Sequence, residues 1–171
     1  MSAGRPAGES RAPGGVRLLE TGALDAVTGE ARLRPRRRAN VNLHAQEDPV
    51  HRLLNAVEPG TYVRPHRHLD PPKDETCVVV RGALGLVLFD ESGAVTAAQR
   101  LTPPPQGVFG VDLPAGVFHS FVALEEGTVF FEAKAGPYVA PSGPHAAPWA
   151  PAEGEPGAAA YEAALRALFP A

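Results

Sequence analysis

Two histidines separated by a single residue, His66 and His68, lie in a stretch that otherwise has the composition of strands and turns, GTYVRPHRHLDPPKDETCVVVRG. Residues i and i+2 of a β-strand project from the same face, so the two imidazoles are expected side by side. Neutral imidazole is a good ligand for divalent iron, zinc, copper and nickel. Glu75 follows a proline-containing turn, and from the start of the next strand its carboxylate can return to the same point. On these three residues alone, metal binding and a solvated surface position both stay open.

A wider pattern adds a fourth residue. The segment from Gly60 to Gly82 reads G-x5-H-x-H-x6-E-x6-G, and the downstream segment LPAGVFHS carries P-x-G-x-x-H, which ends at His119. Together these segments resemble the two sequence motifs of the cupins. The resemblance implies a small β-barrel in which His66, His68, Glu75 and His119 converge on one metal ion.

The sequence departs from the cupin motifs at three places. The gap between His68 and Glu75 is two residues longer than the family pattern, Val108 stands where the second motif opens with glycine, and Ala123 stands where it ends with asparagine. None of these changes removes a ligand. The additional residues lie in a turn, where extra length costs little free energy.

A narrower resemblance covers most of the chain from Arg36 onward. Segments including RRRANVNLH, DPVHRLLNAVEPGTYVRPHRH, FDESGAV, EAKAGPY and WAPAEG are similar to those of the WbuC-type cupin fold metalloproteins, a family associated with bacterial O-antigen and surface-polysaccharide gene clusters. This implies a metal-binding protein that acts on a saccharide or another small polar or anionic molecule. It also implies that the terminal segments contribute to the site. The reaction itself is not supplied by the resemblance.

Three imidazoles and a carboxylate would leave two positions open on an octahedral ion, which favours iron, manganese or nickel as the divalent metal. A tetrahedral zinc ion, the other candidate, would have no open position unless Glu75 dissociated. Such a centre suits an isomerase, an epimerase or an oxygenase. A non-catalytic cupin that binds or senses a small ligand, and a barrel in which the metal is only structural, are the alternatives. Whether the protein is an enzyme is left open.

Other polar residues are candidates for the same pocket. Arg64 lies two residues before His66, and Arg38 belongs to a cluster of arginines at 32, 34, 36, 37 and 38. An arginine fork matches carboxylate or phosphate, so Arg64 and Arg38 are predicted to bind substrate. Asn42 is predicted to bind substrate as well, because it could line the same pocket. His44, which alternates with Asn42, and Tyr138 are the candidates for acid–base catalysis. Each candidate also has a structural alternative. Arg64 could lie on the barrel rim, Arg38 could belong to a solvated connector, Asn42 and His44 could cap a strand edge, and Tyr138 could be a packed aromatic residue.

The strands that position these residues are expected between about residues 40 and 135. There the sequence has short runs rich in Val, Phe, Leu and Thr, separated by turn signals such as EPG, DPP, ESG and PAG. Many short strands at regular spacing predict an all-β sandwich or barrel. Together with the resemblance to the cupins, which implies a barrel, this gives the expected fold, a single-domain cupin-type β-barrel (jelly roll) with short flanking helices. FDESGAV is expected to form a hairpin turn. A short helix is expected within residues 16–34.

The two ends of the chain have different compositions from the barrel. Residues 1–15 lack periodicity and are expected to form a disordered N-terminal tail, so the N-terminal arm and barrel would span residues 16–135. Residues 136–171 are predicted to form a proline-rich strap and a C-terminal helix that pack on the barrel. Gly136–Tyr138 should border the pocket, and Trp149 should pack on the barrel exterior or on that helix.

Composition narrows the class of partner. A net charge of −3 argues against a dedicated nucleic-acid-binding protein, and Cys77 as the single cysteine excludes a disulfide within one chain. No apolar stretch is long enough to cross a membrane, and the N-terminus lacks a signal-peptide pattern. We therefore expect a cytoplasmic protein with a small-molecule partner, without nucleic acid or membrane partners. A homodimer stays open.

Overall fold

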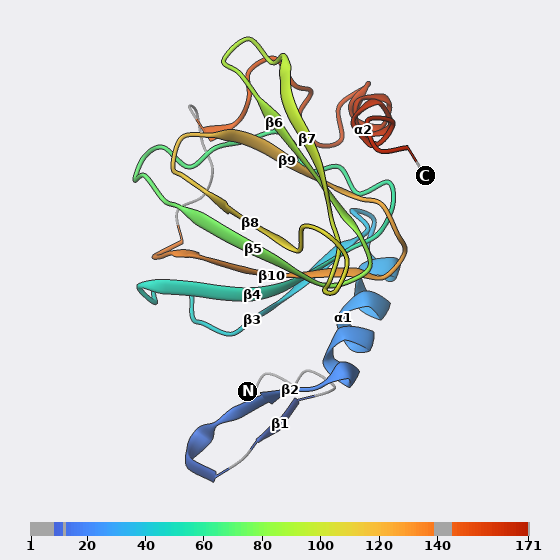
Figure 1. Ribbon diagram of the computed structural model, residues 1–171. Coiled ribbons are helices and arrows are strands. Elements are labelled where there is room, and N and C mark those ends of the chain that lie inside the picture. The colour runs from blue at the N-terminus through green and yellow to red at the C-terminus, as the bar shows by residue number, and fades with distance from the viewer. Residues whose placement is uncertain (1–8, 12, 139–144, 171) are drawn as a thin grey trace.

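Two antiparallel sheets face each other in the computed structural model, which describes residues 9–11, 13–138 and 145–170 (Figure 1). The larger sheet has the strand order β3-β4-β10-β5-β8, and the smaller has the order β7-β6-β9. The large-sheet strands are β3 (Arg38–Asn42), β4 (Val50–Val57), β5 (Glu75–Arg81), β8 (Gly110–Leu113) and β10 (Thr128–Ala135). Those of the small sheet are β6 (Leu84–Phe89), β7 (Val95–Leu101) and β9 (Phe118–Ala123).

The strand order is that of a jelly roll. In the large sheet β10 lies between β4 and β5, and in the small sheet β6 lies between β7 and β9. The segment 63–68 lies along the free edge of β9, where His66 and His119 exchange backbone hydrogen bonds of 2.9 Å. With this segment included, the small sheet has four strands, and these together with β4-β10-β5-β8 of the large sheet have the order of the double Greek key, while β3 is a fifth strand at the edge of the large sheet. The predicted all-β jelly roll with flanking helices is confirmed, and so is the hairpin between β6 and β7.

The stretch TYVRPHRH is less regular than expected. It was predicted as a strand, but it forms only isolated bridges, from His66 to His119 and to Ala146. Pro65 has no N–H to donate to a ladder, which explains why regular pairing does not extend along this segment. The backbone is nevertheless close enough to β9 to fix His66 beside His119.

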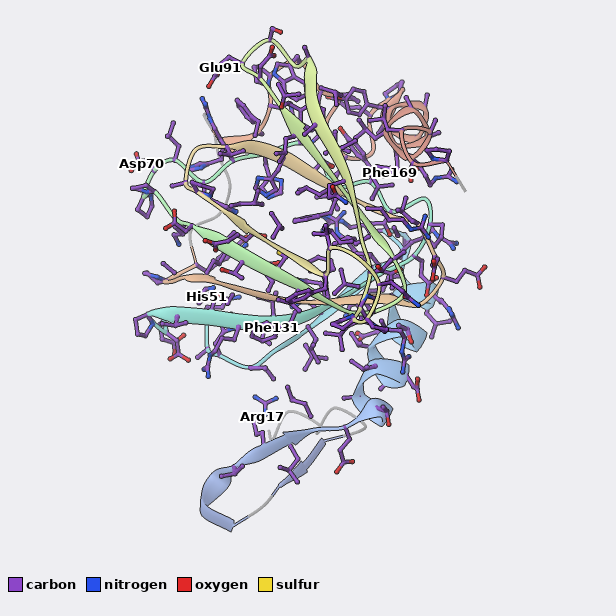
Figure 2. The ribbon with its side chains drawn as sticks, in the orientation of Figure 1. Arg17, His51, Asp70, Glu91, Phe131 and Phe169 are labelled. Carbon is purple, nitrogen blue, oxygen red and sulfur yellow. The ribbon has the colours of Figure 1, made fainter. Side chains whose placement is uncertain are left out.

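Apolar side chains from both sheets pack against one another in the barrel interior (Figure 2). They alternate along the strands with residues that face outward, as the pleat requires. The most deeply buried members of this inner cluster are Cys77, Val79, Leu84, Leu101 and Ala123.

Helix α1 (Thr21–Leu33) covers the outer face of the large sheet, where its Val27 and Ala31 pack on Leu54 and Val129. The helix predicted within residues 16–34 is therefore present, although it begins only at Thr21. Strand β2 (Arg17–Leu19) precedes it and pairs with β1 (Glu9–Arg11). No helix in the described part of the chain has the length and apolar character needed to cross a bilayer.

The hairpin of β1 and β2 corrects the expectation of a disordered tail for residues 9–11, whereas residues 1–8 and 12 lie outside the described residues. The chain reverses at Pro13–Gly15, a short 3₁₀ turn in which Gly14 and Gly15 have φ values of 76° and 78°. Glycine adopts this left-handed conformation at no steric cost, so consecutive glycines make the reversal accessible.

The C-terminal segment from residue 145 onward covers the outer face of the small sheet. Trp149 lies against Phe89 and Phe118, with ring centroids 5.0 and 5.8 Å apart, and Leu165 of α2 (Ala158–Arg166) joins the same cluster. The strap is also tied to the segment 62–67, because Ala147 N donates to Pro65 O at 2.9 Å. Residues 139–144 of the predicted strap lie outside the described residues.

Tyr62 provides a further anchor for the strap, since its hydroxyl donates to Pro151 O at 2.8 Å. We expect Tyr62→Phe to lower the free energy of unfolding by about 1 kcal/mol, the usual net value of one hydrogen bond. Burial raises the pKa of Tyr62 to about 12. The hydroxyl therefore contributes stability that is complete below the unfolded-state pKa of about 10 and lost as the pH rises toward 12. Urea unfolding at pH 8 and pH 11 should show the difference between wild type and variant shrinking at the higher pH.

Candidate metal centre

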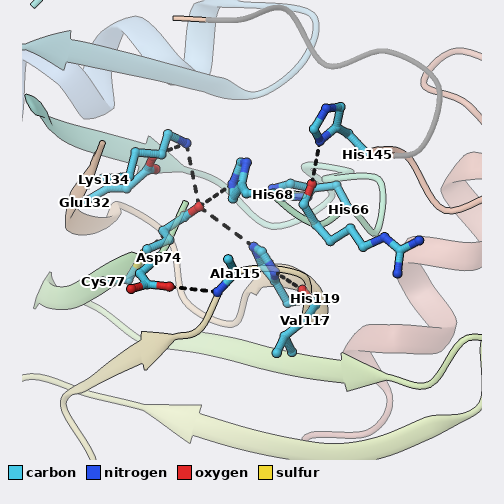
Figure 3. Close-up of polar contacts among 12 residues, drawn as sticks. His66, His68, Asp74, Cys77, Ala115, Val117, His119, Glu132, Lys134 and His145 are labelled. Atoms are coloured by element: carbon cyan, nitrogen blue, oxygen red, sulfur yellow. Dashed lines mark hydrogen bonds and ion pairs between the residues drawn. The ribbon is translucent and has the colours of Figure 1, made fainter. Parts of the chain in front are cut away.

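Four side chains that were predicted to act together meet at one end of the barrel interior. His66 and His68 come from the segment beside β9, Glu75 begins β5, and His119 is the second residue of β9. One ligand atom from each lies within 4.8 Å of the corresponding atoms of the others. Nε2 of His68 lies 2.6 Å and Nε2 of His119 lies 4.0 Å from the same oxygen, Glu75 Oε2. Figure 3 shows the imidazoles of His68 and His119 directed toward a common point.

Backbone hydrogen bonds fix the orientation of two of the imidazoles. Nδ1 of His66 lies 3.0 Å from Arg64 O, and Nδ1 of His119 lies 2.9 Å from Val117 O. A carbonyl oxygen only accepts, so in each ring Nδ1 carries the proton and Nε2 presents its lone pair to the centre. This is the tautomer that a metal ligand requires.

The Nε2 atom of His119 is the observation that best tests the fit of a metal. It is buried and has no hydrogen-bond partner among the described residues. An unsatisfied acceptor in the interior carries a desolvation penalty, and such groups are rare in native proteins. A divalent ion would satisfy this atom together with His66, His68 and Glu75. The donor set of imidazole and carboxylate therefore fits a divalent metal.

Burial keeps the imidazoles in their neutral, ligating form. Desolvation, reinforced by the nearby His119, lowers the pKa of His66 to about 3, and burial likewise lowers the pKa of His119. Both rings are consequently uncharged at neutral pH. A metal ion would not have to displace a proton from either ring.

Glu75 is buried, with 3% of its surface exposed, and accepts a hydrogen bond of 2.6 Å from His68 Nε2. Burial opposes its ionisation, but the hydrogen bond from His68 and the charge of Lys134 outweigh burial and hold the pKa of Glu75 well below its usual range. The longer turn before Glu75 does not displace it from the cluster. Asp74 fastens that turn to the second motif by accepting a 2.8 Å hydrogen bond from Ala115 N.

Lys134 was missed in the sequence. On β10 it pairs in register with Glu75, and Glu132 pairs with Cys77. Lys134 Nζ lies 2.5 Å from Glu132 Oε1 and 3.6 Å from Glu75 Oε2 (Figure 3). Burial disfavours its charge, but Glu132 and Glu75 outweigh this effect and raise the pKa of Lys134. The signal that could have revealed it was the alternation of Phe130, Glu132 and Lys134 along one strand.

Glu132 is buried beside the four candidate ligands and contacts Asn55 and Lys134. It accepts a 2.7 Å hydrogen bond from Asn55 Nδ2 as well as its contact with Lys134. Burial and the nearby Glu75 raise the pKa of Glu132. Cys77, which was expected to be a small interior residue, is fully buried, and burial raises the pKa of its thiol.

A cavity of about 580 Å³ connects the metal cluster with the arginine-rich segment before β3. Lys134, Glu132, His66 and Glu75 lie at one part of its lining, and Phe121 and Phe130 provide apolar wall. A smaller cavity, of about 70 Å³, shares His66 and Lys134 and also contacts His68 and Tyr138. The cluster therefore lies between two cavities, the larger of which has the size of a small-molecule site.

The arginine cluster divides into two groups. Arg34, Arg36 and Arg38 line the large cavity. Arg32 instead pairs with the buried Glu58 at 2.9 Å, and Arg37 donates to Pro59 O at 2.8 Å. The cluster is thus partly a structural connector and partly cavity wall, with Arg34 and Arg36 in the turn between α1 and β3 and Arg38 at the first position of β3.

The remaining candidates for substrate binding lie elsewhere. Arg64 donates to Ala147 O of the strap at 2.7 Å and is not among the described residues that line either cavity. Its backbone carbonyl, rather than its guanidinium, faces His66. Asn42 accepts a 2.6 Å hydrogen bond from Asn40, and it is Asn40 that lines the large cavity.

The two candidates for acid–base catalysis are placed differently. Tyr138 lines the small cavity, as expected for the border of the pocket, and is 55% exposed. His44 stacks on His51 with ring centroids 4.0 Å apart and contacts the backbone of Arg52. His44 is not among the described residues lining either cavity.

Comparison with known proteins gives a partial match to one family. A family described as a domain of unknown function (DUF6016) matches residues 19–101, which include His66, His68 and Glu75 but not His119. No curated protein sequence gave a significant match.

Several solved structures are similar in fold. KdgF from Halomonas sp. is 20% identical, with 60% of this chain and 82% of that chain covered and a TM-score of 0.47. The E162A mutant of oxalate decarboxylase from Bacillus subtilis is 21% identical, with coverages of 61% and 26% and a TM-score of 0.46. Oxalate oxidase in complex with glycolate is 16% identical, with coverages of 60% and 52% and a TM-score of 0.47. This chain spans about a quarter of the oxalate decarboxylase and about half of the oxalate oxidase. Likeness this distant does not transfer an activity.

Proposed function

We propose that this protein is a metal-binding cupin in which His66, His68, Glu75 and His119 hold one divalent ion, with iron, manganese or nickel favoured over zinc. The observation that carries the proposal is the convergence of the four ligand atoms around the buried, unpartnered Nε2 of His119. The cupin motifs of the sequence and the jelly-roll strand order support it independently.

The metal, when bound, would supply a Lewis acid or a centre for dioxygen chemistry. The chain's own residues would position a ligand beside it. Lys134 offers an ammonium group to an anionic oxygen, and Asn55 holds Glu132 in place by its hydrogen bond. Phe121 and Phe130 exclude water from the wall of the cavity, which strengthens electrostatic contacts inside it.

We further propose a saccharide or another small polar or anionic molecule as the ligand, in surface-polysaccharide biosynthesis of the O-antigen type. This rests on the resemblance to WbuC-type proteins and on the basic lining of the large cavity. Isomerisation, epimerisation and oxygenation are the reactions that such a centre suits. The alternative is a non-catalytic protein that binds or senses the same ligand.

The test combines metal analysis with turnover. We expect protein loaded with iron, manganese or nickel to retain about one ion per chain after dialysis, as measured by elemental analysis. Incubation of each loaded form with a panel of nucleotide sugars, followed by chromatography of the products, separates the enzyme from the binding protein. Ligand binding without product would favour the non-catalytic alternative, and absence of retained metal would refute the metal centre.

We expect Glu75→Gln to weaken metal binding by at least about tenfold while the barrel stays folded. The amide is a poorer ligand than the carboxylate, and it no longer compensates the charge of Lys134. Competition with a fluorescent chelator gives the metal affinity, and circular dichroism checks the fold. Glu125→Gln, which alters an exposed ion pair with Arg100 outside both cavities, is the matched control. An unchanged affinity in Glu75→Gln would show that only the three histidines bind the ion.

A further inference from the structure

Glu153 of the strap places its carboxylate on two arginines of the large cavity. Arg36 Nη2 lies 2.5 Å from Glu153 Oε2, and Arg38 donates to the other carboxylate oxygen, Oε1. Both arginines line the cavity that reaches the metal cluster. The pair therefore already binds a carboxylate, one that belongs to the protein itself.

The arginine pair has the features of a built oxyanion site. Arg38 is 22% exposed, and its other terminal nitrogen donates to Tyr62 O at 2.6 Å, which orients the guanidinium plane. An oriented fork loses little conformational entropy when it binds a carboxylate or phosphate. Arg34 lines the same cavity, and its guanidinium pairs with Glu30 of α1.

The contact with Glu153 is suited to being displaced. The side chain of Glu153 retains 34% exposure, and that of Arg36 retains 63%, so both partners face solvent. Ion pairs at such positions contribute little net stability. Partial burial raises the pKa of Glu153, and Arg36 offsets only part of that effect. Glu153 is also held independently of the arginines, because the strap is anchored through Pro151 and Ala147.

We propose that Arg36 and Arg38 form the recognition site for the carboxylate or phosphate group of the ligand, and that Glu153 occupies this site as an intramolecular stand-in until the ligand displaces it. The proposal rests on the proposed function in that the ligand is the one that reaches the metal cluster. To the proposed function it adds the chemical group of the ligand that Arg36 and Arg38 recognise. It also adds that Glu153 of the strap competes with the ligand for these arginines. A tethered competitor lowers the apparent affinity by the fraction of time for which the site is free.

The test is calorimetric titration of chelator-treated and metal-loaded protein with malonate and, separately, with inorganic phosphate. We expect Glu153→Gln to bind at least one of the two anions about fivefold more tightly than wild type, which corresponds to a site that is free about a fifth of the time. The anion that gains affinity identifies the group recognised. The double variant Arg36→Gln/Glu153→Gln should lose that gain. Arg36 is chosen because Arg38 also supports the backbone at Tyr62.

Glu125→Gln is the matched control, since it removes a carboxylate from an exposed pair with Arg100 outside the cavity. It should bind both anions as wild type does. Equal affinities of Glu153→Gln and wild type would overturn the proposal, and so would a double variant that binds as tightly as Glu153→Gln. The chelator-treated protein is titrated as well, so binding of the anion to the arginines is measured without metal. Failure of the anion site can therefore be distinguished from failure of the metal centre.

Discussion

His119→Ala is expected to lose stoichiometric metal, from about one ion per chain to less than about a tenth after dialysis. Four-ligand zinc sites in small peptides contribute about 10–16 kcal/mol, so one ligand accounts for roughly 3 kcal/mol, or about two orders of magnitude in Kd. His119 is also the ligand whose Nε2 atom has no alternative partner among the described residues. Elemental analysis of protein loaded with manganese or iron gives the occupancy.

The control for this experiment is His44→Ala. His44 is a histidine of the same chain that stacks on His51 and lies outside the cluster. The His44 variant should retain its metal, and circular dichroism should show that both variants keep their β structure. If His119→Ala retained a full complement of metal, the ion would have to bind elsewhere and the assignment of the centre would be wrong.

Trp149→Ala is expected to have the largest effect on stability among single substitutions in the strap, with a loss of about 2–3 kcal/mol. Truncating a buried aromatic residue to alanine costs about 3–5 kcal/mol, and the lower range applies here because Trp149 is only partly buried. The variant leaves Phe89 and Phe118 without their aromatic partner on the outer face of the small sheet. Urea unfolding measures the loss, and Trp149→Phe should recover much of it.

The same substitution should also affect the metal centre. The strap bonds to the segment that carries His66, through Arg67 N to His145 O and Ala147 N to Pro65 O, each at 2.9 Å. Loosening the strap would allow the segment 63–68 to move relative to β9. We therefore expect a lower metal affinity in Trp149→Ala than in Trp149→Phe. A stable variant with unchanged metal affinity would show that the strap only covers the sheet.

The spacing of the histidines allowed much of the site to be predicted. The H-x-H pair, the glutamate at the start of a strand and the later P-x-G-x-x-H segment indicated one cluster, and the structure brings these four side chains together. The all-β class was also predictable, since strand lengths and turn residues are local properties, and the resemblance to the cupins implied the jelly roll. The irregular backbone around Pro65 was not predicted, because an alternating pattern does not show which N–H groups will be missing from a ladder.

The arginines and the lysine show why the rest required the tertiary structure. The residue types in the 32–38 cluster were visible in the sequence, but the structure decided that Arg36 and Arg38 line the cavity while Arg32 and Arg37 hold the turn before β3. Side-chain direction there depends on where the strand begins and on the left-handed residue Arg37, with φ of 53°.

By itself, the sequence determined the residue types available for a site and the all-β class of the fold, because these depend on local spacing and hydrophobic pattern, and the resemblance to the cupins implied the grouping of His119 with His66, His68 and Glu75. The pairing of β10 with β5, which places Lys134 beside Glu75, was decided only by the tertiary structure. So was the position of Glu153 on two arginines more than a hundred residues away in the chain. Such contacts depend on the register between distant strands and on the path of a proline-rich strap, and the free energies that select them come from packing of the whole barrel rather than from any local preference.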